Sequence, residues 1–407
     1  MHVKHCLPAV LGALPVLAQS SSFNPPEHHN PDPFQPYTIR AENITATVIP
    51  YGARLTSLLV PDRDDQLQDV VVGYDDPREY LHDTQTAHTY FGAVVGRYAN
   101  RIKNGTFTLD GEEYDIPTNE HNGANTLHGG NIGYDQRNWT VSALSDSSVT
   151  FTLVDRALQG FPGDVVTHAV FSVDTERSPA NPHGRPQLTT QLVSLAMTHS
   201  TPIMLSNHIY WNLNGFKQHD VLEDTFLQLP LSPRFVATDG ILIPNGTILN
   251  ADAAYSGSPD FTAGKLVGAD IDETTGLCGT GCTGYDNCFI VDRPPAYAGA
   301  EDAMVPTVRM NSSTTGISLD VAMNQHAVQI YSCNGQDGHI PVKQSQVERN
   351  NGHGAQFVNQ YGCVVIEPQG WIDGINHPEW GQLKDQIYSP ATAPALNWAT
   401  YQFGTIQ

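Results

Sequence analysis

Short runs in which apolar and polar residues alternate with a period of two recur along the chain, and this pattern restricts the fold most. The clearest runs cover residues 149–155, 165–174, 188–198, 326–333 and 362–367. Such alternation is typical of antiparallel strands that bury one face, and turn-forming residues separate the runs. The sequence contains no amphipathic helix of more than three turns, no repeat and no dividing linker. These features predict an all-β protein built as one large antiparallel β-sandwich.

The N-terminal 18 residues have the features of a secretory signal peptide. Lys4 supplies a basic start, residues 7–17 are apolar, and residues 16–18 (Val-Leu-Ala) form a small-residue cleavage pattern. Residues 19–36 are rich in Pro, Ser, His and Asn and predict a flexible lead-in, and residues 37–407 should form the sandwich. No later segment approaches the ~20 apolar residues that span a bilayer. We therefore expect a secreted, extracellular protein with no membrane partner.

The charge of the chain argues against one class of partner. Acidic residues outnumber basic ones by 42 to 20, and the formal net charge is −22. A surface of this sign repels a phosphate backbone, so we expect no nucleic-acid partner. N-x-[ST] sequons agree with a secretory route, although a chain this rich in Asn would contain some by chance. The glycosylation candidates are Asn43, Asn104, Asn138, Asn245 and Asn311.

The cysteines predict disulfides rather than a metal site. Cys6 lies in the expected signal peptide, which leaves five cysteines and hence at least one that is free or pairs with another chain. The sequence has no CxxC pair and no HExxH, so we expect no metal site. Among Cys278, Cys282 and Cys288 we expect one bridge and one free thiol. The Gly-flanked pair Cys278–Cys282 is the favoured bridge.

Three alternating runs place polar residues on the face opposite to their apolar residues. His208 lies opposite an apolar face, Glu367 follows an apolar strand directly before a Pro-Gln-Gly turn, and Gln329 shares a face with Tyr331. Each of these side chains could line a wet cleft. Equally, His208 could be a surface histidine, Glu367 could mark the point where its strand meets water, and Gln329 could lie on a solvated face. The runs alone leave both interpretations open. They cover residues 202–215, 363–371 and 326–333.

Five motifs follow one another along the chain and together carry a resemblance. They are GRYANRI (96–102), LHGG (127–130), SNHIYWNL (206–213), GYDN (284–287) and VVIEPQ (364–369). In this order and spacing, from about Tyr37 to the C-terminus, they resemble the galactose mutarotase (aldose 1-epimerase) family. The resemblance implies a large β-sandwich of the galactose mutarotase-like supersandwich type with an open sugar-binding cleft. It also implies that residues 37–407 form the catalytic domain of an isomerase, which interconverts the α and β anomers of a free aldose.

The resemblance also assigns roles to the motif residues. It implies Glu367 as the base at the C1 hydroxyl, His208 as the acid at the ring oxygen, and His128 as a second histidine near that oxygen. The residues expected to contact sugar hydroxyls are Arg101, Asn100, Asp286 and Gln329. Arg97 belongs to the first motif, but its spacing favours a structural role.

The implied reaction explains why a glutamate and a histidine are needed. Ring opening removes a proton from the C1 hydroxyl and adds one to the ring oxygen, so one base and one acid suffice without a cofactor. With ordinary pKa values the glutamate would be ionised at neutral pH and the histidine could carry the proton. The expected partner is a free monosaccharide (glucose, galactose or a pentose) or the reducing end of an oligosaccharide.

Other functions fit the sequence less well. A secreted carbohydrate-binding protein would retain Arg101 and Asp286 but would need no acid/base pair. A glycoside hydrolase could use Glu367 and Asp286 as its two carboxylates, but the histidines would then have no role. A hexose-phosphate epimerase should carry extra basic residues around its cleft, and the sequence contains no such cluster.

The matched residues lead to one more disulfide. The resemblance places Gln329 on the strand next to Glu367. If these two residues are directly opposed in an antiparallel pair, Cys333 and Cys363 are opposed as well, because each lies four residues away on the same side. Directly opposed Cβ atoms at a non-hydrogen-bonded site are close enough for a bridge. We therefore predict a Cys333–Cys363 disulfide that closes the polar loop 334–361.

Overall fold

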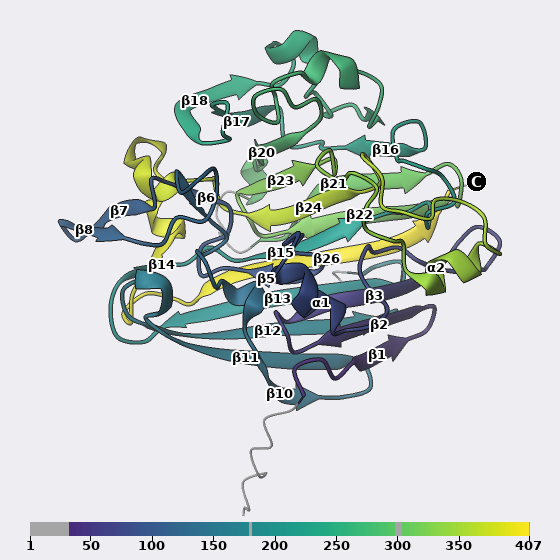
Figure 1. Ribbon diagram of the computed structural model, residues 1–407, viewed down its shortest axis with the longest axis horizontal. Helices are drawn as coiled ribbons and strands as arrows, with labels where there is room; N and C mark the ends of the chain where they lie inside the picture. The colour runs from purple at the N-terminus through teal and green to yellow at the C-terminus, as the bar shows by residue number, and fades with distance from the viewer. Residues whose placement is uncertain (1–31, 179–180, 298–302, 407) are drawn as a thin grey trace, which may run out of the picture. The chain divides into compact units, whose positions relative to one another are not determined.

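Two antiparallel sheets, of nine and seven strands, contribute to a common hydrophobic core in the computed structural model (Figure 1). The structure describes residues 32–178, 181–297 and 303–406, which belong to the unit Pro31–Gln407. The expected signal peptide and residues 19–31 of the expected lead-in lie outside these ranges. The described end of that lead-in contacts the sheets, since the ring of Phe34 lies 5.4 Å from that of Tyr51. The sequence prediction of a large antiparallel β-sandwich is confirmed.

The larger sheet is antiparallel throughout. Its longest members are the strands with the most regular alternation in the sequence, as expected for strands buried on one face. In spatial order the strands are β10 (Thr140–Leu144), β11 (Ser148–Arg156), β12 (Asp164–Asp174), β13 (Gln187–Ala196), β26 (Ala395–Thr405), β22 (Ile317–Met323), β21 (Val305–Ser312), β16 (Thr225–Gln228) and β19 (Lys265–Leu266).

The seven-stranded sheet carries three of the five motifs, SNHIYWNL, GYDN and VVIEPQ. In spatial order its strands are β18 (Pro244–Asn250), β17 (Arg234–Thr238), β20 (Asp286–Ile290), β23 (Ala327–Tyr331), β24 (Val364–Gln369), β15 (Ser206–Trp211) and β5 (Ala93–Val95). Since β20, β23, β24 and β15 are neighbours, segments that are far apart in the sequence are adjacent in space.

Smaller elements surround these sheets. A four-stranded sheet contains β1 (Tyr37–Ala41), β2 (Ile44–Ile49), β3 (Arg54–Pro61) and β4 (Leu67–Asp69), in that order. Short antiparallel pairs are β6 (Arg101–Lys103) with β9 (Asn125–Leu127), β7 (Thr106–Leu109) with β8 (Glu112–Asp115), and β14 (Thr201–Pro202) with β25 (Ile387–Tyr388). The α-helices are α1 (Glu79–Thr84) and α2 (Gln344–Arg349). In the described part of the chain, neither is long and apolar enough to cross a membrane.

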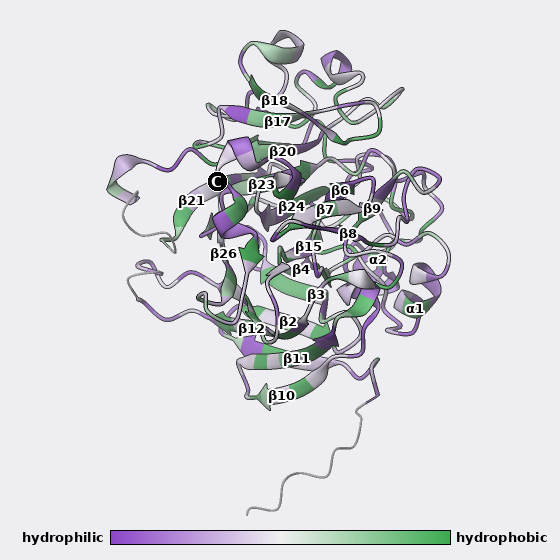
Figure 2. Ribbon diagram, turned by 90° about the vertical axis from the view of Figure 1, so that its left-hand side faces the viewer, coloured by the Kyte–Doolittle hydropathy of each residue, from purple (hydrophilic) through white to green (hydrophobic). Residues whose placement is uncertain are grey.

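The main core lies between the two large sheets. Trp211 of β15 is fully buried, and its ring lies 5.1 Å from that of Tyr401 and 6.0 Å from that of Phe403, both on β26. Each large apolar side chain buried here stabilises the fold by ~1.5–3 kcal/mol relative to leaving it exposed. In Figure 2 the hydrophobic colour is concentrated on the strands, and the loops are mostly hydrophilic.

Strand geometry turns the polar residues of the seven-stranded sheet away from this core. On β15, Ile209 and Trp211 belong to the core whereas His208 lines a cleft on the opposite face. The same alternation places Ile366 in the core and Glu367 in the cleft. Because side chains alternate with a period of two, the register of each strand decides which groups reach the cleft.

Strand β24 is longer than the sequence predicted. The expectation that Glu367 closes its strand is wrong, because the strand continues through Pro368 to Gln369. A proline lacks the N–H that a ladder needs, but the Pro368 carbonyl accepts bonds from Ser206 Oγ at 2.9 Å and Asn397 Nδ2 at 2.6 Å. These side-chain bonds fix the strand at this position, and Glu367 therefore lies inside the sheet.

The predicted register and both predicted disulfides are present. Gln329 is directly opposite Glu367 in the β23–β24 pair, and the Cys333–Cys363 disulfide joins residues whose Cα atoms are 5.4 Å apart. The second bridge is Cys278–Cys282, and within the described residues Cys288 is free and buried. The loop 334–361 contains α2, and Lys343 anchors it through Asp69, with Nζ 2.7 Å from Oδ2. This loop therefore connects the cleft with the four-stranded sheet.

Candidate active site

A cleft of about 550 Å³ opens on the face of the seven-stranded sheet that lies away from the main core. Its volume is within the usual range for small-molecule sites. All seven residues that the sequence assigned to catalysis or sugar binding line it: His128, His208, Glu367, Arg101, Asn100, Asp286 and Gln329. They come from β15, β20, β23 and β24, from β6, and from the segments that flank β6 and β9.

The centre of the cleft is an imidazole–carboxyl pair. His208 Nε2 lies 3.3 Å from Glu367 Oε1, and the two side chains are only 6% and 4% exposed. These groups reach each other because β15 and β24 are adjacent and antiparallel, with Ile209 opposite Ile366. This separation is just beyond hydrogen-bond reach, so a small movement of either side chain brings the nitrogen and the oxygen close enough to exchange a proton.

Burial changes the proton affinity of both groups in opposite directions. Removal from water lowers the pKa of His208 to about 3. Burial, reinforced by the Asp286 carboxylate and opposed by Arg101, raises the pKa of Glu367 well above its ordinary value. For one proton shared by the pair, burial therefore favours Glu367 over His208, the reverse of the distribution expected from ordinary pKa values. The pair has zero net charge in both distributions. With the proton on Glu367 both groups are neutral, and with the proton on His208 an imidazolium faces a carboxylate.

His128 is held in a single tautomer. Its Nδ1 accepts a hydrogen bond from the backbone N–H of Asn100 at 3.0 Å, so Nδ1 carries no proton and Nε2 does. Burial, reinforced by the neighbouring His208 and Arg101, lowers the pKa of His128 well below its ordinary value. The ring is therefore neutral at physiological pH, and its Nε2–H is a hydrogen-bond donor.

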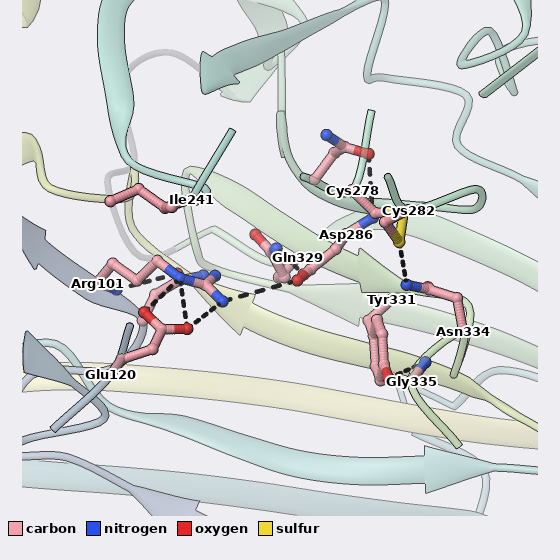
Figure 3. Close-up of polar contacts among 12 residues, drawn as sticks. Arg101, Glu120, Ile241, Cys278, Cys282, Asp286, Gln329, Tyr331, Asn334 and Gly335 are labelled. Carbon is pink, nitrogen blue, oxygen red and sulfur yellow. Dashed lines mark hydrogen bonds and ion pairs between the residues drawn. A yellow bond between two sulfur atoms is a disulfide. The ribbon is translucent and has the colours of Figure 1, made fainter. Parts of the chain in front are cut away.

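A charged network supports the other side of the cleft (Figure 3). The Arg101 guanidinium donates to both carboxylate oxygens of Glu120, with Nε–Oε2 and Nη2–Oε1 distances of 2.9 and 2.7 Å. Its Nη2 also lies 3.9 Å from Asp286 Oδ2. Burial acts to lower the pKa of Arg101, but the two carboxylates outweigh it and raise the pKa. The bidentate contact with Glu120 fixes the plane of the guanidinium.

Gln329 belongs to this network and lies directly opposite Glu367 on the neighbouring strand. Its Nε2 donates a hydrogen bond to Asp286 Oδ1 at 2.6 Å. This bond fixes the orientation of the amide group, so Oε1 is its oxygen and does not take part in the contact with Asp286. Among the described residues, neither Gln329 Oε1 nor Glu367 Oε2 has a hydrogen-bond partner, although both atoms are buried. Buried polar atoms are rarely left unpaired in native proteins, so a ligand with several hydroxyl groups fits this part of the cleft.

Two arginines of the first motif are used differently. Arg97 is buried and bonds to Asp155 Oδ2 at 2.9 Å and to the carbonyl groups of Pro162 and Gly163. This matches the structural role that its spacing favoured. Asn100 bonds to the Arg101 N–H and to Gln369, so its side chain orients neighbouring residues as well as lining the cleft.

Among the described residues, the acid/base group is also the one with the donor atoms of a metal site. One donor atom from each of His128, His208 and Glu367 lies within 4.8 Å of the other two. Two ligands of one tetrahedral zinc ion are about 3.4 Å apart, given metal–nitrogen distances of ~2.1 Å. The 3.3 Å contact between His208 and Glu367 therefore suits two ligands of one ion as well as a proton-sharing pair.

The sequence did not predict three residues of this site. Glu120 is one, and its pairing with Arg101 is a tertiary contact that no local pattern signals. The others are His88 and Tyr90, which line the cleft directly before the first motif. Their position next to that motif was the only available signal.

The comparisons with known proteins agree with this geometry. The family model described as aldose 1-epimerase matches residues 35–387. A protein of Arthroderma benhamiae named "Probable aldose 1-epimerase" is 58% identical over 381 residues, which cover 91% of this chain and 87% of that protein. The galactose mutarotase of Bos taurus is 30% identical, over 84% of this chain and 87% of its own.

A solved structure shows the same architecture. The aldose epimerase homologue from C. elegans superposes with a TM-score of 0.73 at 25% identity, covering 92% of this chain and 99% of that one. Fold and cleft thus define an isomerase of free sugars, built on the galactose mutarotase-like β-sandwich. The chain belongs to the aldose 1-epimerase family.

Proposed function

We propose that this protein is a secreted aldose 1-epimerase in which His208 and Glu367 interconvert sugar anomers by sharing one mobile proton. The observation that carries the proposal is the buried contact of 3.3 Å between His208 Nε2 and Glu367 Oε1 in a cleft with unpaired polar atoms. An acid and a base that differ by one proton are what ring opening requires. Neither the carbohydrate-binding nor the hydrolase alternative accounts for this pair.

In the proposed mechanism the sugar binds with its C1 hydroxyl at Glu367 and its ring oxygen at His208. The hydroxyl donates a hydrogen bond to the carboxylate and thereby stabilises the ionised form of the pair, in which His208 carries the proton. Glu367 then removes the C1 hydroxyl proton while His208 protonates the ring oxygen, and the bond between C1 and that oxygen breaks. The open-chain aldehyde is left beside a neutral imidazole and a protonated carboxyl, the distribution that burial favours.

Ring closure uses the same two groups in reverse. After rotation about the C1–C2 bond the hydroxyl at C5 attacks the other face of the aldehyde, His208 takes its proton, and Glu367 returns one to the carbonyl oxygen. The pair ends as it began, so turnover needs no proton from solvent. The neutral His128 donates its Nε2–H near the ring oxygen, and Arg101, Asp286 and Gln329 hold the remaining hydroxyls.

The proposed substrate is a free aldose such as glucose, galactose or a pentose, or the reducing end of an oligosaccharide. Freshly dissolved α-glucose and α-galactose should approach anomeric equilibrium faster with the protein than without it, as measured by polarimetry. Acceleration of neither sugar, nor of xylose or arabinose, together with measurable sugar binding would favour a binding protein instead. Release of reducing ends from a glycoside would favour a hydrolase.

Secretion is a separate part of the proposal. Two disulfides support it, since such bonds persist in oxidising compartments. Four of the candidate sequon residues are exposed, and Asn311 is half-buried. Expression in a eukaryotic secretory host should yield protein in the medium with a new N-terminus near Gln19 and a mass that falls after removal of N-glycans. Retention inside the cell with an intact N-terminus would contradict the proposal. The exposed residues are Asn43, Asn104, Asn138 and Asn245.

A further inference from the structure

The segment before the first motif is held in an unusual backbone conformation at the edge of the cleft. His88 and Tyr90 both have positive φ values, 50° and 63°, in the left-handed region that such residues rarely adopt. Thr89 between them is fixed on both sides. Its N–H and hydroxyl donate to the Asp83 carboxylate at 3.0 Å, and its carbonyl accepts the Tyr210 hydroxyl. Strained residues persist where surrounding contacts impose them, and they concentrate at functional sites.

This conformation directs two rings into the cleft beside the acid/base pair. The rings of His88 and Tyr90 are stacked with centroids 4.1 Å apart. The Tyr90 ring in turn lies 4.7 Å from that of His128 and 5.7 Å from that of His208. Along this wall, Glu367 is followed by His208 and His128, which lie at the expected position of the ring oxygen. Tyr90 comes next, and His88 is last.

The ring of His88 is held by a buried carboxylate. Its Nε2 lies 2.9 Å from Asp135 Oδ2, and the Asp135 side chain is only 1% exposed. Since a carboxylate can only accept, Nε2 carries the proton and Nδ1 is left as an acceptor in the neutral ring. Within the described ranges no residue bonds to Nδ1, and the side chain is 26% exposed and lines the cleft. This arrangement presents one fixed acceptor to a ligand.

The connectivity of a pyranose indicates which hydroxyl this acceptor meets. The ring oxygen is bonded to C1 on one side and to C5 on the other, and in a hexose C5 carries the C6 hydroxymethyl group. If C1 lies at Glu367 and the ring oxygen at His208, C5 lies next along the wall, towards Tyr90. We propose that His88 Nδ1 accepts a hydrogen bond from the C6 hydroxyl and makes the enzyme prefer hexoses to sugars that lack this group. This inference rests on the proposed mutarotase function and on its orientation of the sugar.

The test compares glucose with 6-deoxyglucose and xylose, which lack the C6 hydroxyl and the whole C6 group, respectively. Wild-type kcat/KM should be about three- to tenfold higher for glucose than for 6-deoxyglucose, the ratio that one ordinary hydrogen bond supplies. His88→Ala and His88→Gly should remove this ratio by lowering the value for glucose and leaving that for xylose within about twofold. Glycine adopts a positive φ without strain, so the second variant preserves the backbone.

The outcomes separate this inference from the proposed function. If the His88 variants lose kcat/KM equally for all three sugars, His88 only supports Tyr90. If the ratio of kcat/KM for glucose to that for 6-deoxyglucose is the same in the variants as in wild type, Nδ1 makes no contact with the sugar. Either result overturns the inference while wild-type activity stands. A wild-type protein inactive on every aldose would overturn the proposed function itself. His183→Ala, which changes an exposed histidine in the loop between β12 and β13, is the matched control and should leave all three values unchanged.

Discussion

The two disulfides should contribute unequally to stability, because they close loops of very different length. Cys333 and Cys363 are 30 residues apart, whereas Cys278 and Cys282 are four residues apart. In the chain-entropy model a loop of ~30 residues contributes about 3.6 kcal/mol at 25 °C, and one of ~4 residues about 1.9 kcal/mol. The double variant Cys333→Ala/Cys363→Ala should therefore lose about 2 kcal/mol more stability than Cys278→Ala/Cys282→Ala.

Urea unfolding followed by circular dichroism measures the difference, with both double variants compared with wild type under the same conditions. Loss of the first bridge should also raise the KM for sugar, because Asn334 to Asp337, His339 and Ile340 line the cleft directly after Cys333. The second variant is the control, since its bridge does not itself line the cleft, although Cys282 Sγ accepts a hydrogen bond from the cleft residue Asn334 (Figure 3). Equal losses of stability, or a larger loss from the four-residue loop, would refute the reasoning.

Three further predictions concern the cleft. Because burial lowers the pKa of His208 to about 3, a fall in pH through the ordinary histidine range adds no second proton to the pair. The pH profile of kcat/KM should therefore show no acid limb near 6.5, and such a limb would mean that His208 titrates independently. His128→Asn retains an acceptor for the Asn100 N–H but loses the Nε2–H donor. The kcat should therefore fall ~10-fold or more, while the pH profile of kcat/KM stays unchanged. A shifted pH profile would contradict a neutral His128. Glu120→Gln removes the charged partner of Arg101 and should raise KM about tenfold with little change in kcat. An unchanged KM would show that the contact between Arg101 and Glu120 does not position the substrate.

Alternation along the strands was sufficient to predict which side of its strand each of His208, Glu367 and Gln329 occupies. The sequence placed His208 opposite an apolar face, and the structure has Ile209 and Trp211 in the core with His208 in the cleft. The Cys333–Cys363 pairing was predictable for the same reason, since one assumed contact between strands determines every other pair in that ladder.

Tertiary contacts account for what the sequence did not predict. The contact of Arg101 with Glu120 joins residues on different segments, and nothing in the local pattern of either residue indicates it. The extension of β24 through Pro368 depends on bonds from Ser206 and Asn397, which a rule about proline in strands does not include. The pKa shifts of His208 and Glu367 likewise result from burial by the assembled sheet, which residue type alone does not determine.

The most direct test of the central claim compares Glu367→Gln, His208→Asn and the double variant in a mutarotation assay with α-galactose. If the two residues form one proton-sharing pair, each single variant should lower kcat by ~10²–10⁴-fold. The double variant should then be no slower than the slower single variant, because residues that act as a unit show non-additive losses. Circular dichroism of all three proteins confirms that they are folded. Losses that multiply in the double variant, or a single variant within about threefold of wild type, would contradict the shared-proton mechanism.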